Sequence, residues 1–450
     1  MNQGTVSMSF VRSIGRWTLI ALMINCIIGS GIFEVPGQVT AEVGRAGPIA
    51  MIVAGLSMCI IVACFIEVGS QFTEPGGVYL YARTAFGRLA GLQVGWFWFL
   101  STLAGAAAAA NLFVDYLAAF FPAAAHGLPR LLVMSGMVLV PALANYRGVR
   151  QGALLSNLFT LAKLLPLVIL IVLGIIRFSR HAEMVPLSEI AGPGWRAWAN
   201  ALVLLFFIYS GYEDSMIPAA EVKDPRRAIP LALIVAVGAC MAVYTLVQFL
   251  VVATVGTSVT NRPLAAAAAV LMGNGGQMFV EVAAMISAYG WLSASMLNAP
   301  RLLYSMADRR ELFGPFGKLH PRFNTPHMSV VTFALLAWLL ALTGTFRWAV
   351  VLSAGAAMIF DGAVCAALLR LRRIQPQAAL FRLRFGPVFS VLGITICLAL
   401  LSRMELKQVL LMSITAFVAT ANWWWARRRD SLARAGNSSV ELGTPVPPLV

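Results

Sequence analysis

Apolar residues along this chain come in long blocks, separated by short polar stretches that contain glycine, proline and arginine. Blocks of about 17 to 25 apolar residues are long enough for a helix to cross a bilayer. The pattern predicts twelve such spans, at 17–40, 46–69, 88–118, 129–145, 152–176, 197–221, 229–254, 277–306, 327–345, 347–370, 386–402 and 406–426. A shorter alanine-rich patch, 263–272, is predicted to be a helix in an outer loop.

The composition agrees with an all-α polytopic membrane protein. Hydrophobic residues make up 60% of the 450 positions and charged residues 11%, against about 25% charged in soluble domains. One transmembrane domain is expected over 17–426, between a cytoplasmic N-terminus at 1–16 and a cytoplasmic, disordered tail at 427–450. The first apolar run is too long for a cleaved signal peptide and is read as the first span.

Loop charges predict the orientation. Most of the 33 Lys and Arg residues fall in loops on the side that carries both termini, which places both ends in the cytoplasm. The net charge of +15 is therefore a topology signal, and no nucleic-acid partner is expected. The alanine- and arginine-rich composition favours a bacterial inner membrane.

No pattern for a metal or cofactor is found in the sequence. The six cysteines fall inside predicted spans without a C-x-x-C pair, and the four histidines fall in predicted loops without ligand spacing. There is no P-loop, so direct use of ATP is not expected. Nothing points to a particular protein partner; the expected surroundings are the lipid bilayer.

The first span contains the sequence IIGSGIFEVPG, from Ile27 to Gly37. Gly29 and Gly31 weaken a helix, and Ser30 competes for its backbone bonds. Irregular backbone at membrane depth is tolerated only where protein buries it or where it lines a wet cavity. A break here would present free N–H groups and a helix N-terminus, which together suit an anion. Close packing of helices through small residues is the alternative.

The sixth span has a similar interruption at Ser210 and Gly211, followed by Glu213 and Asp214. Two adjacent acids inside a span indicate surroundings of protein or water and not lipid. If spans 1–5 and 6–10 are inverted copies, the two breaks occupy corresponding positions. We therefore predict a 5+5 inverted repeat with broken first and sixth helices, plus two extra C-terminal helices.

The two breaks together suit a zwitterion. Amide groups of the first break would bind a carboxylate, and carbonyl groups at the end of the first half of the sixth span would attract an ammonium group. An α-amino acid is the simplest ligand with both groups.

Four motifs make the sequence resemble the amino acid–polyamine–organocation transporter superfamily. They are the G-S-G-I-F of the first span, EPGGVYLYARTAFGRLAGLQVGW from Glu74, YSGYED…AEVKDPRRAIP of the sixth span, and APRLLYSMADRRELFGPFGKLHPRFNTP from Ala299. They occur in the family's order over roughly residues 17–425. The resemblance implies an amino acid permease that works by alternating access.

The resemblance also implies a substrate site at the two breaks. It assigns the carboxylate to the backbone of Gly29, Ser30 and Gly31, and the amino group to carbonyls near Ile27, Phe207, Ile208 and Ser210. Phe207 would be the aromatic gate, with ordinary packing as the alternative. The expected substrate-binding residues are Ile27, Ile28, Gly29, Ser30, Gly31, Phe207, Ile208, Tyr209, Ser210 and Gly211.

Three charged residues inside spans are candidates for coupling or gating. Lys163 is the only lysine in a span, and the resemblance implies that it takes the place of a sodium ion; a buried lysine can also release and regain a proton. Glu213 is read either as a gating or proton-linked group or as a partner of nearby backbone. Asp361 is expected to hydrogen-bond inside the bundle or to lie on the permeation route. Glu67 and Asp115, nearer span ends, are assigned local structural roles.

The sequence thus favours a Na⁺-independent secondary transporter of neutral amino acids, by proton coupling or by exchange. Aromatic and aliphatic residues around the breaks favour a neutral substrate. A permease or antiporter for cationic amino acids or polyamines is the alternative. A membrane enzyme is disfavoured because no clustered catalytic set lies inside the spans. A sensor and a channel are more distant alternatives.

Overall fold

The computed structural model describes residues 15–72, 77–148, 153–180, 193–213, 225–257, 260–376, 379 and 381–441. Within these ranges the chain is helical and contains no strand. The α-helices are α1 (Arg16–Ile27), α2 (Val35–Val43), α3 (Gly47–Gly69), α4 (Gly77–Phe86), α5 (Arg88–Leu117), α6 (Gly127–Tyr146), α7 (Ala153–Arg180), α8 (Trp195–Tyr209), α9 (Pro225–Val255), α10 (Pro263–Asp308), α11 (His327–Thr343), α12 (Phe346–Ile374), α13 (Gly386–Leu401) and α14 (Leu406–Glu441). Short 3₁₀ helices are η1 (Ser30–Phe33), η2 (Gly44–Ala46), η3 (Pro122–Ala125) and η6 (Gly314–Gly317).

The described helices agree with a polytopic membrane protein. Eight helical segments among the described residues are long and apolar enough to cross a membrane, with Val35–Gly69 treated as one segment. Four shorter apolar helices accompany them: α1, α8, α11 and α13. Each predicted span thus has a helix at its position, whereas the twelve-span arrangement and its inverted repeat stay predictions.

Several boundaries differ from the sequence pattern. The helix α14 continues to Glu441, beyond residue 426 where the last span was predicted to end. The alanine-rich patch 263–272 is helical, and a kink at Gly273 (φ 69°) joins it to the predicted eighth span in α10. His327 is the first residue of α11 and does not lie in a loop. Asp214 and the rest of the predicted sixth span, 214–221, lie outside the described residues.

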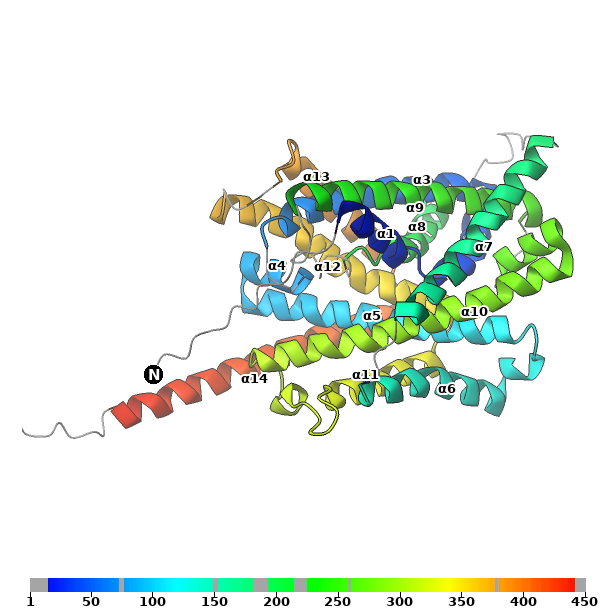
Figure 1. Ribbon diagram of the computed structural model, residues 1–450. Helices are drawn as coiled ribbons and strands as arrows, with labels where there is room; N and C mark the ends of the chain where they lie inside the picture. Colours follow the sequence, from blue (N-terminus) through cyan, green and yellow to red (C-terminus); the bar gives the residue numbers. More distant parts are fainter. Residues whose placement is uncertain are drawn as a thin grey trace, which may run out of the picture.

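The helix α5 forms the centre of the bundle. It packs against α4, α10, α11, α12 and α14, and it is apolar around most of its circumference, which is typical of a buried helix. A run of small residues, Gly105–Ala110, is buried and lets neighbouring backbones approach closely. In Figure 1, α5 runs beside α10 through the middle of the bundle, while α7 crosses the other helices obliquely.

A buried ion pair ties α3 to the C-terminal end of α12. Glu67 is completely buried and accepts two bonds of 2.6 Å from the guanidinium of Arg372. The backbone N–H of Leu383 donates a third bond to the same carboxylate at 2.8 Å. The structural role expected for Glu67 is therefore present, in the form of an acid with three donors.

Replacing Arg372 by Gln should destabilise the protein strongly, because it leaves the Glu67 carboxylate buried without a cation. Loss of one partner of a buried pair costs about 3–5 kcal/mol. Thermal unfolding of the purified protein in detergent measures the effect. The exposed neighbour Arg373 provides the control, since Arg373→Gln should change the free energy of unfolding by less than about 0.5 kcal/mol. Equal effects of the two substitutions would contradict this account.

Candidate functional site

The predicted break in the first span is present. The helix α1 ends at Ile27, Ile28 and Gly29 leave helical geometry, and η1 begins at Ser30. The Gly29 amide donates to the Ile27 carbonyl at 2.8 Å, so it is already used within the break. The amides of Ser30 and Gly31 come first in η1, ahead of that helix's first internal bond. They are the donors that this break offers to a ligand.

The second break follows Tyr209, the last residue of α8. Ser210 is extended (φ −71°, ψ 171°), and its hydroxyl donates to the Phe206 carbonyl at 2.7 Å, which helps to end the helix. Gly211 has a φ of +104°, a left-handed region that favours glycine. Its amide donates to the Glu213 carboxylate at 2.8 Å, so the expected bond between Glu213 and nearby backbone is observed.

The two breaks are in direct contact. A Cβ atom added to Gly211 would lie 2.6 Å from the carbonyl oxygen of Cys26, so the second break packs on the last turn of α1. The hydroxyl of Tyr244, on α9, lies 3.0 Å from the Ile27 carbonyl and 3.0 Å from the Ile208 carbonyl. The Tyr244 hydroxyl thus lies between two carbonyl groups, one at the C-terminal end of α1 and one at the C-terminal end of α8.

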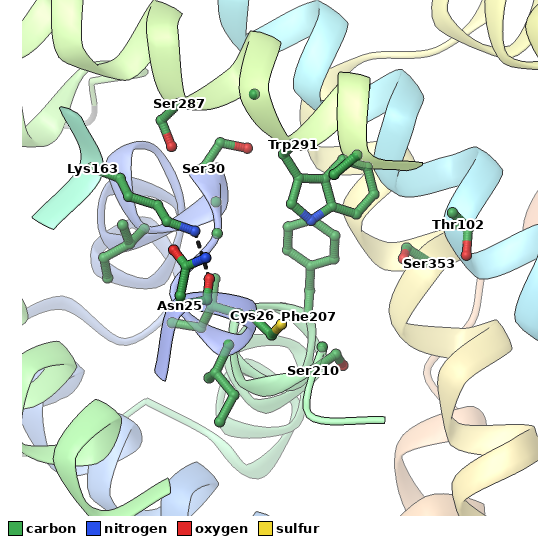
Figure 2. Close-up of a pocket in the computed structure, with 18 of the residues that line it drawn as sticks. Asn25, Cys26, Ser30, Thr102, Lys163, Phe207, Ser210, Ser287, Trp291 and Ser353 are labelled. Carbon is green, nitrogen blue, oxygen red and sulfur yellow. Dashed lines mark hydrogen bonds between the residues drawn. The ribbon is translucent and has the colours of Figure 1, made fainter. Parts of the chain in front are cut away.

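Lys163 joins α7 to the same region. Its ammonium group donates to the carbonyl oxygen of Asn25 at 2.5 Å, as Figure 2 shows. Asn25 belongs to the last turn of α1, where unsatisfied carbonyls carry partial negative charge and attract a cation. The structure therefore places the lysine against the first break.

A cavity of about 360 Å³ lies between the two breaks and the surrounding helices. The α1 residues that line the cavity precede the break. No residue of α2 lines it. Of the site residues predicted from sequence, the cavity is lined by Ile27, Gly29, Ser30, Gly31, Lys163, Phe207, Ile208, Ser210, Gly211 and Glu213.

Two predicted residues do not line the cavity. Ile28 is buried in the core. Tyr209 is buried as well; its hydroxyl donates to the Met51 carbonyl at 2.9 Å, and its ring packs against Tyr244. Their side chains support the breaks from behind and do not face the cavity.

Phe207 covers the first break. A Cβ atom on Gly31 would lie 2.7 Å from the Phe207 ring, so the glycine makes room for the aromatic side chain. Figure 2 shows the rings of Phe207 and Trp291 next to each other on one side of the cavity, with Lys163, Ser30 and Ser287 on the other. Phe207 thus lines the cavity and does not face lipid.

Sequence reasoning missed most of the cavity wall, which α5, α7, α10 and α12 supply. Trp291 resembles any tryptophan of an apolar span, and single serines in spans are common, so neither residue type gave a signal. Ser101 and Ser353 exchange hydroxyl-to-carbonyl bonds of 3.0 and 2.9 Å between α5 and α12. The residues missed are Leu22, Asn25, Cys26, Ile32, Trp98, Ser101, Thr102, Phe159, Thr160, Ser287, Gly290, Trp291, Ala294, Asn298 and Ser353.

The side chains that line the cavity include one cation and one acid. Its only charged lining residues among those described are Lys163 and Glu213. Asp361 lies outside it: the carboxylate is buried in α12 and accepts a bond of 2.9 Å from the Tyr212 hydroxyl, which matches the bundle-internal role. No cluster of metal-ligating side chains is found in the described part of the chain.

Two interrupted helices that meet beside one cavity inside an apolar bundle are the arrangement of a membrane transporter. A family model for amino acid permeases matches residues 14–435. The chain belongs to this family, which is part of the amino acid–polyamine–organocation superfamily that the motifs predicted.

Individual relatives are transporters of several substrates. A methylthioribose transporter of Bacillus subtilis is 27% identical over 87% of this chain and 88% of its own length. The serine/threonine exchanger SteT of the same organism is 26% identical over 73% of this chain and 77% of its own. An arginine/ornithine antiporter of Latilactobacillus sakei is 30% identical over 72% of this chain and 71% of its own length.

Replacing Gly211 by Ala should disrupt the site. The new Cβ would press on the Cys26 carbonyl, and alanine disfavours the required φ, so we expect a loss of about 1–3 kcal/mol in stability together with loss of uptake. Gly238, in α9, has nothing within 4 Å of an added Cβ, and Gly238→Ala is the matched control. Thermal unfolding and uptake in proteoliposomes measure both. If Gly211→Ala behaved like Gly238→Ala, the close contact of the breaks would be wrong.

Proposed function

We propose that this protein is a Na⁺-independent secondary transporter of neutral amino acids. It lies in a bacterial inner membrane with both termini in the cytoplasm, and it moves substrate by alternating access, through proton coupling or exchange. Its twelve spans form a 5+5 inverted repeat followed by two C-terminal helices. The observation that carries the proposal is the meeting of free amides and helix-end carbonyls of two broken helices at one cavity.

The first break supplies the carboxylate end of the site. The amides of Ser30 and Gly31 begin η1 and line the cavity, and a helix N-terminus favours negative charge. Lys163 adds a positive charge on the same side. A carboxylate at this position would meet two N–H donors and the field of an ammonium group.

The end of α8 supplies the amino end of the site. The carbonyl groups near Ile208 and Ser210 point out of a helix C-terminus, where a cation is favoured. Tyr244 already donates to the Ile27 and Ile208 carbonyls, and a carbonyl oxygen has a second lone pair for a ligand. Phe207 and Trp291 close the site over the substrate.

The remaining wall favours an uncharged side chain. Ser101, Thr102, Asn298 and Ser353 give it hydroxyl and amide groups without net charge. Glu213 is the one acid, and one of its oxygens accepts a bond from Gly211. A small or hydroxylated neutral amino acid fits these surroundings, and the name of the serine/threonine exchanger among the relatives agrees with this substrate class.

Cationic amino acids are the second candidate. Glu213 lines the cavity, and one relative is named as an arginine/ornithine antiporter. Phe207 at the gate position weighs against this candidate, because tryptophan is the better partner for a cation.

A thermal-shift screen of the purified protein tests the substrate class. A neutral amino acid at about 100 times its Kd should stabilise the protein by about 2.7 kcal/mol, and equally with and without Na⁺. Its carboxamide and its N-acetyl derivative, which each lack one charged end, are the matched controls and should not stabilise it. Arginine, a polyamine and methylthioribose complete the screen. Stabilisation by a ligand without a carboxylate would contradict the zwitterion site.

Replacing Lys163 by Gln tests the role of the lysine in Na⁺ independence. A hydrogen bond from a charged group contributes about 1.5–3 kcal/mol. Loss of the bond from Lys163 to the Asn25 carbonyl should therefore lower uptake at least about tenfold. The exposed Lys318 gives the control Lys318→Gln, which should transport normally. Uptake by Lys163→Gln at the wild-type rate and with the wild-type pH profile would exclude the proposed role.

A further inference from the structure

Glu34 is a buried acid that does not line the cavity. It follows η1 directly and precedes α2, three residues after Gly31. Its side chain is 1% exposed. Its oxygen Oε2 has no hydrogen-bond partner among the described residues. An ionisable group in such a place is expensive and marks a functional site by default.

In the described part of the chain, the charged groups around Glu34 do not provide it with a cation of its own. Arg130 is bound to Asn111 at 2.6 Å and lies 3.9 Å from Asp115. Arg262 is bound to Glu281 at 2.8 Å. Asp115 adds a like charge near Glu34. The groups that face this region are Asp115 and Tyr116 from α5, Arg130 from α6, Asn200 from α8, Gln248 from α9, Arg262 and Glu281 next to and within α10, and Arg347 from α12.

Within the described ranges, hydrogen bonds hold the Glu34 carboxyl from one side only. The side-chain amide of Gln38, one turn further along α2, donates to the Glu34 carboxyl, and its side-chain oxygen Oε1 accepts from Arg347 at 3.4 Å. This orientation leaves Oε2 as the oxygen without a donor. An ionised carboxylate accepts hydrogen bonds on both oxygens, whereas a protonated carboxyl accepts on its carbonyl oxygen and carries an O–H group on the other.

The same chain of contacts closes α2 against its neighbours. Arg347, near the start of α12, forms an ion pair with Glu42 of α2. Glu42 in turn accepts a bond of 3.2 Å from Asn200 of α8. These residues lie beyond the break, on the face that the charge pattern assigns to the outside. Glu34 lies just before the N-terminal end of α2 and is linked to these contacts through Gln38, which Arg347 also binds.

We propose that Glu34 binds the proton that is coupled to transport. When α2 separates from α12 and α8, water from the outside reaches the carboxylate, and a hydronium ion transfers its proton to Oε2. The neutral carboxylic acid can then be buried as the outer contacts form again. The cavity then opens toward the cytoplasm, where α1 begins. The O–H bond of the Glu34 carboxyl breaks, and the proton passes to water in the cavity, which Gly31 and Ile32 line. This inference rests on the proposed transport function and selects proton coupling.

The burial of Glu34 sets the order of these steps. A carboxylate without a cation is costly to remove from water, so closure of the outer contacts is favoured only after protonation. A proton thus acts as a second ligand that must bind before the outer side closes. Lys163, on the other side of the break, is not required to move a proton in this scheme.

Transport by Glu34→Gln in proteoliposomes tests the proposal. Glutamine resembles the protonated acid, so exchange of labelled for unlabelled substrate across equal pH should persist. Accumulation driven by a pH gradient should fall at least about tenfold, because the amide does not titrate. The amino acid that stabilises the wild-type protein in the thermal screen is the probe. Glu405, an exposed acid, provides the control Glu405→Gln, which should accumulate substrate normally.

Gradient-driven accumulation by Glu34→Gln at the wild-type level would overturn the proposal. If that variant lost exchange as well, labelling of the wild-type protein with a hydrophobic carbodiimide decides, since the reagent attacks protonated carboxyls. An adduct mapped to Glu34 by mass spectrometry, decreasing as the pH is raised, supports the proposal, and its absence at acidic pH overturns it. Labelling needs no substrate, so it stays informative even if every amino acid fails in the thermal screen.

Discussion

The need to satisfy backbone polar groups in apolar surroundings governs this structure. An unbroken helix meets that need within itself, but α1 and α8 end inside the bundle and leave amides and carbonyls without helical partners. The structure meets part of the need with side chains from other helices. Tyr244 serves the Ile27 and Ile208 carbonyls, and Lys163 serves the Asn25 carbonyl. Each broken end is thus fixed by a helix distant in sequence.

The same constraint explains why the site is open to a ligand. The amides of Ser30 and Gly31 precede the first bond of η1, and they line a cavity instead of lipid. A zwitterion would complete the backbone bonding that the fold leaves incomplete. Packing maintains this arrangement: Gly31 accommodates Phe207, and the small residues of α5 allow Trp291 to lie against Gly105.

Three buried acids show how differently one fold can treat a carboxyl group. Glu67 has a guanidinium and a backbone amide, and it fastens α3 to α12. Asp361 has the hydroxyl of Tyr212 and stays within the bundle. Glu34 has one amide donor and an oxygen for which the described residues supply no partner. Only the last arrangement leaves a proton-binding atom unused at a junction of helices, which is why Glu34 and not the others carries the coupling proposal.

The sequence by itself determined the class of the protein and the position of both breaks. Apolar block length reflects bilayer thickness, and Gly29, Gly31 and Gly211 mark backbone that a regular helix cannot provide, so these features are local. The motifs likewise located the family and the cavity residues at the two breaks, but not the rest of the cavity wall. The end of the last helix was less predictable, because α14 runs to Glu441 and its charged residues still permit a helix.

Only the tertiary structure decided which side chains surround the site and which acids lack partners. Trp291, Ser287 and Ser353 come from helices that any apolar pattern would describe equally well, and their approach to the breaks depends on how the bundle packs. Tyr209 was expected at the cavity but faces Met51 and Tyr244, since a one-residue shift at the end of a helix rotates a side chain by about 100°. Partnerships such as Arg372 with Glu67 join residues 305 positions apart, a separation over which local sequence carries no information.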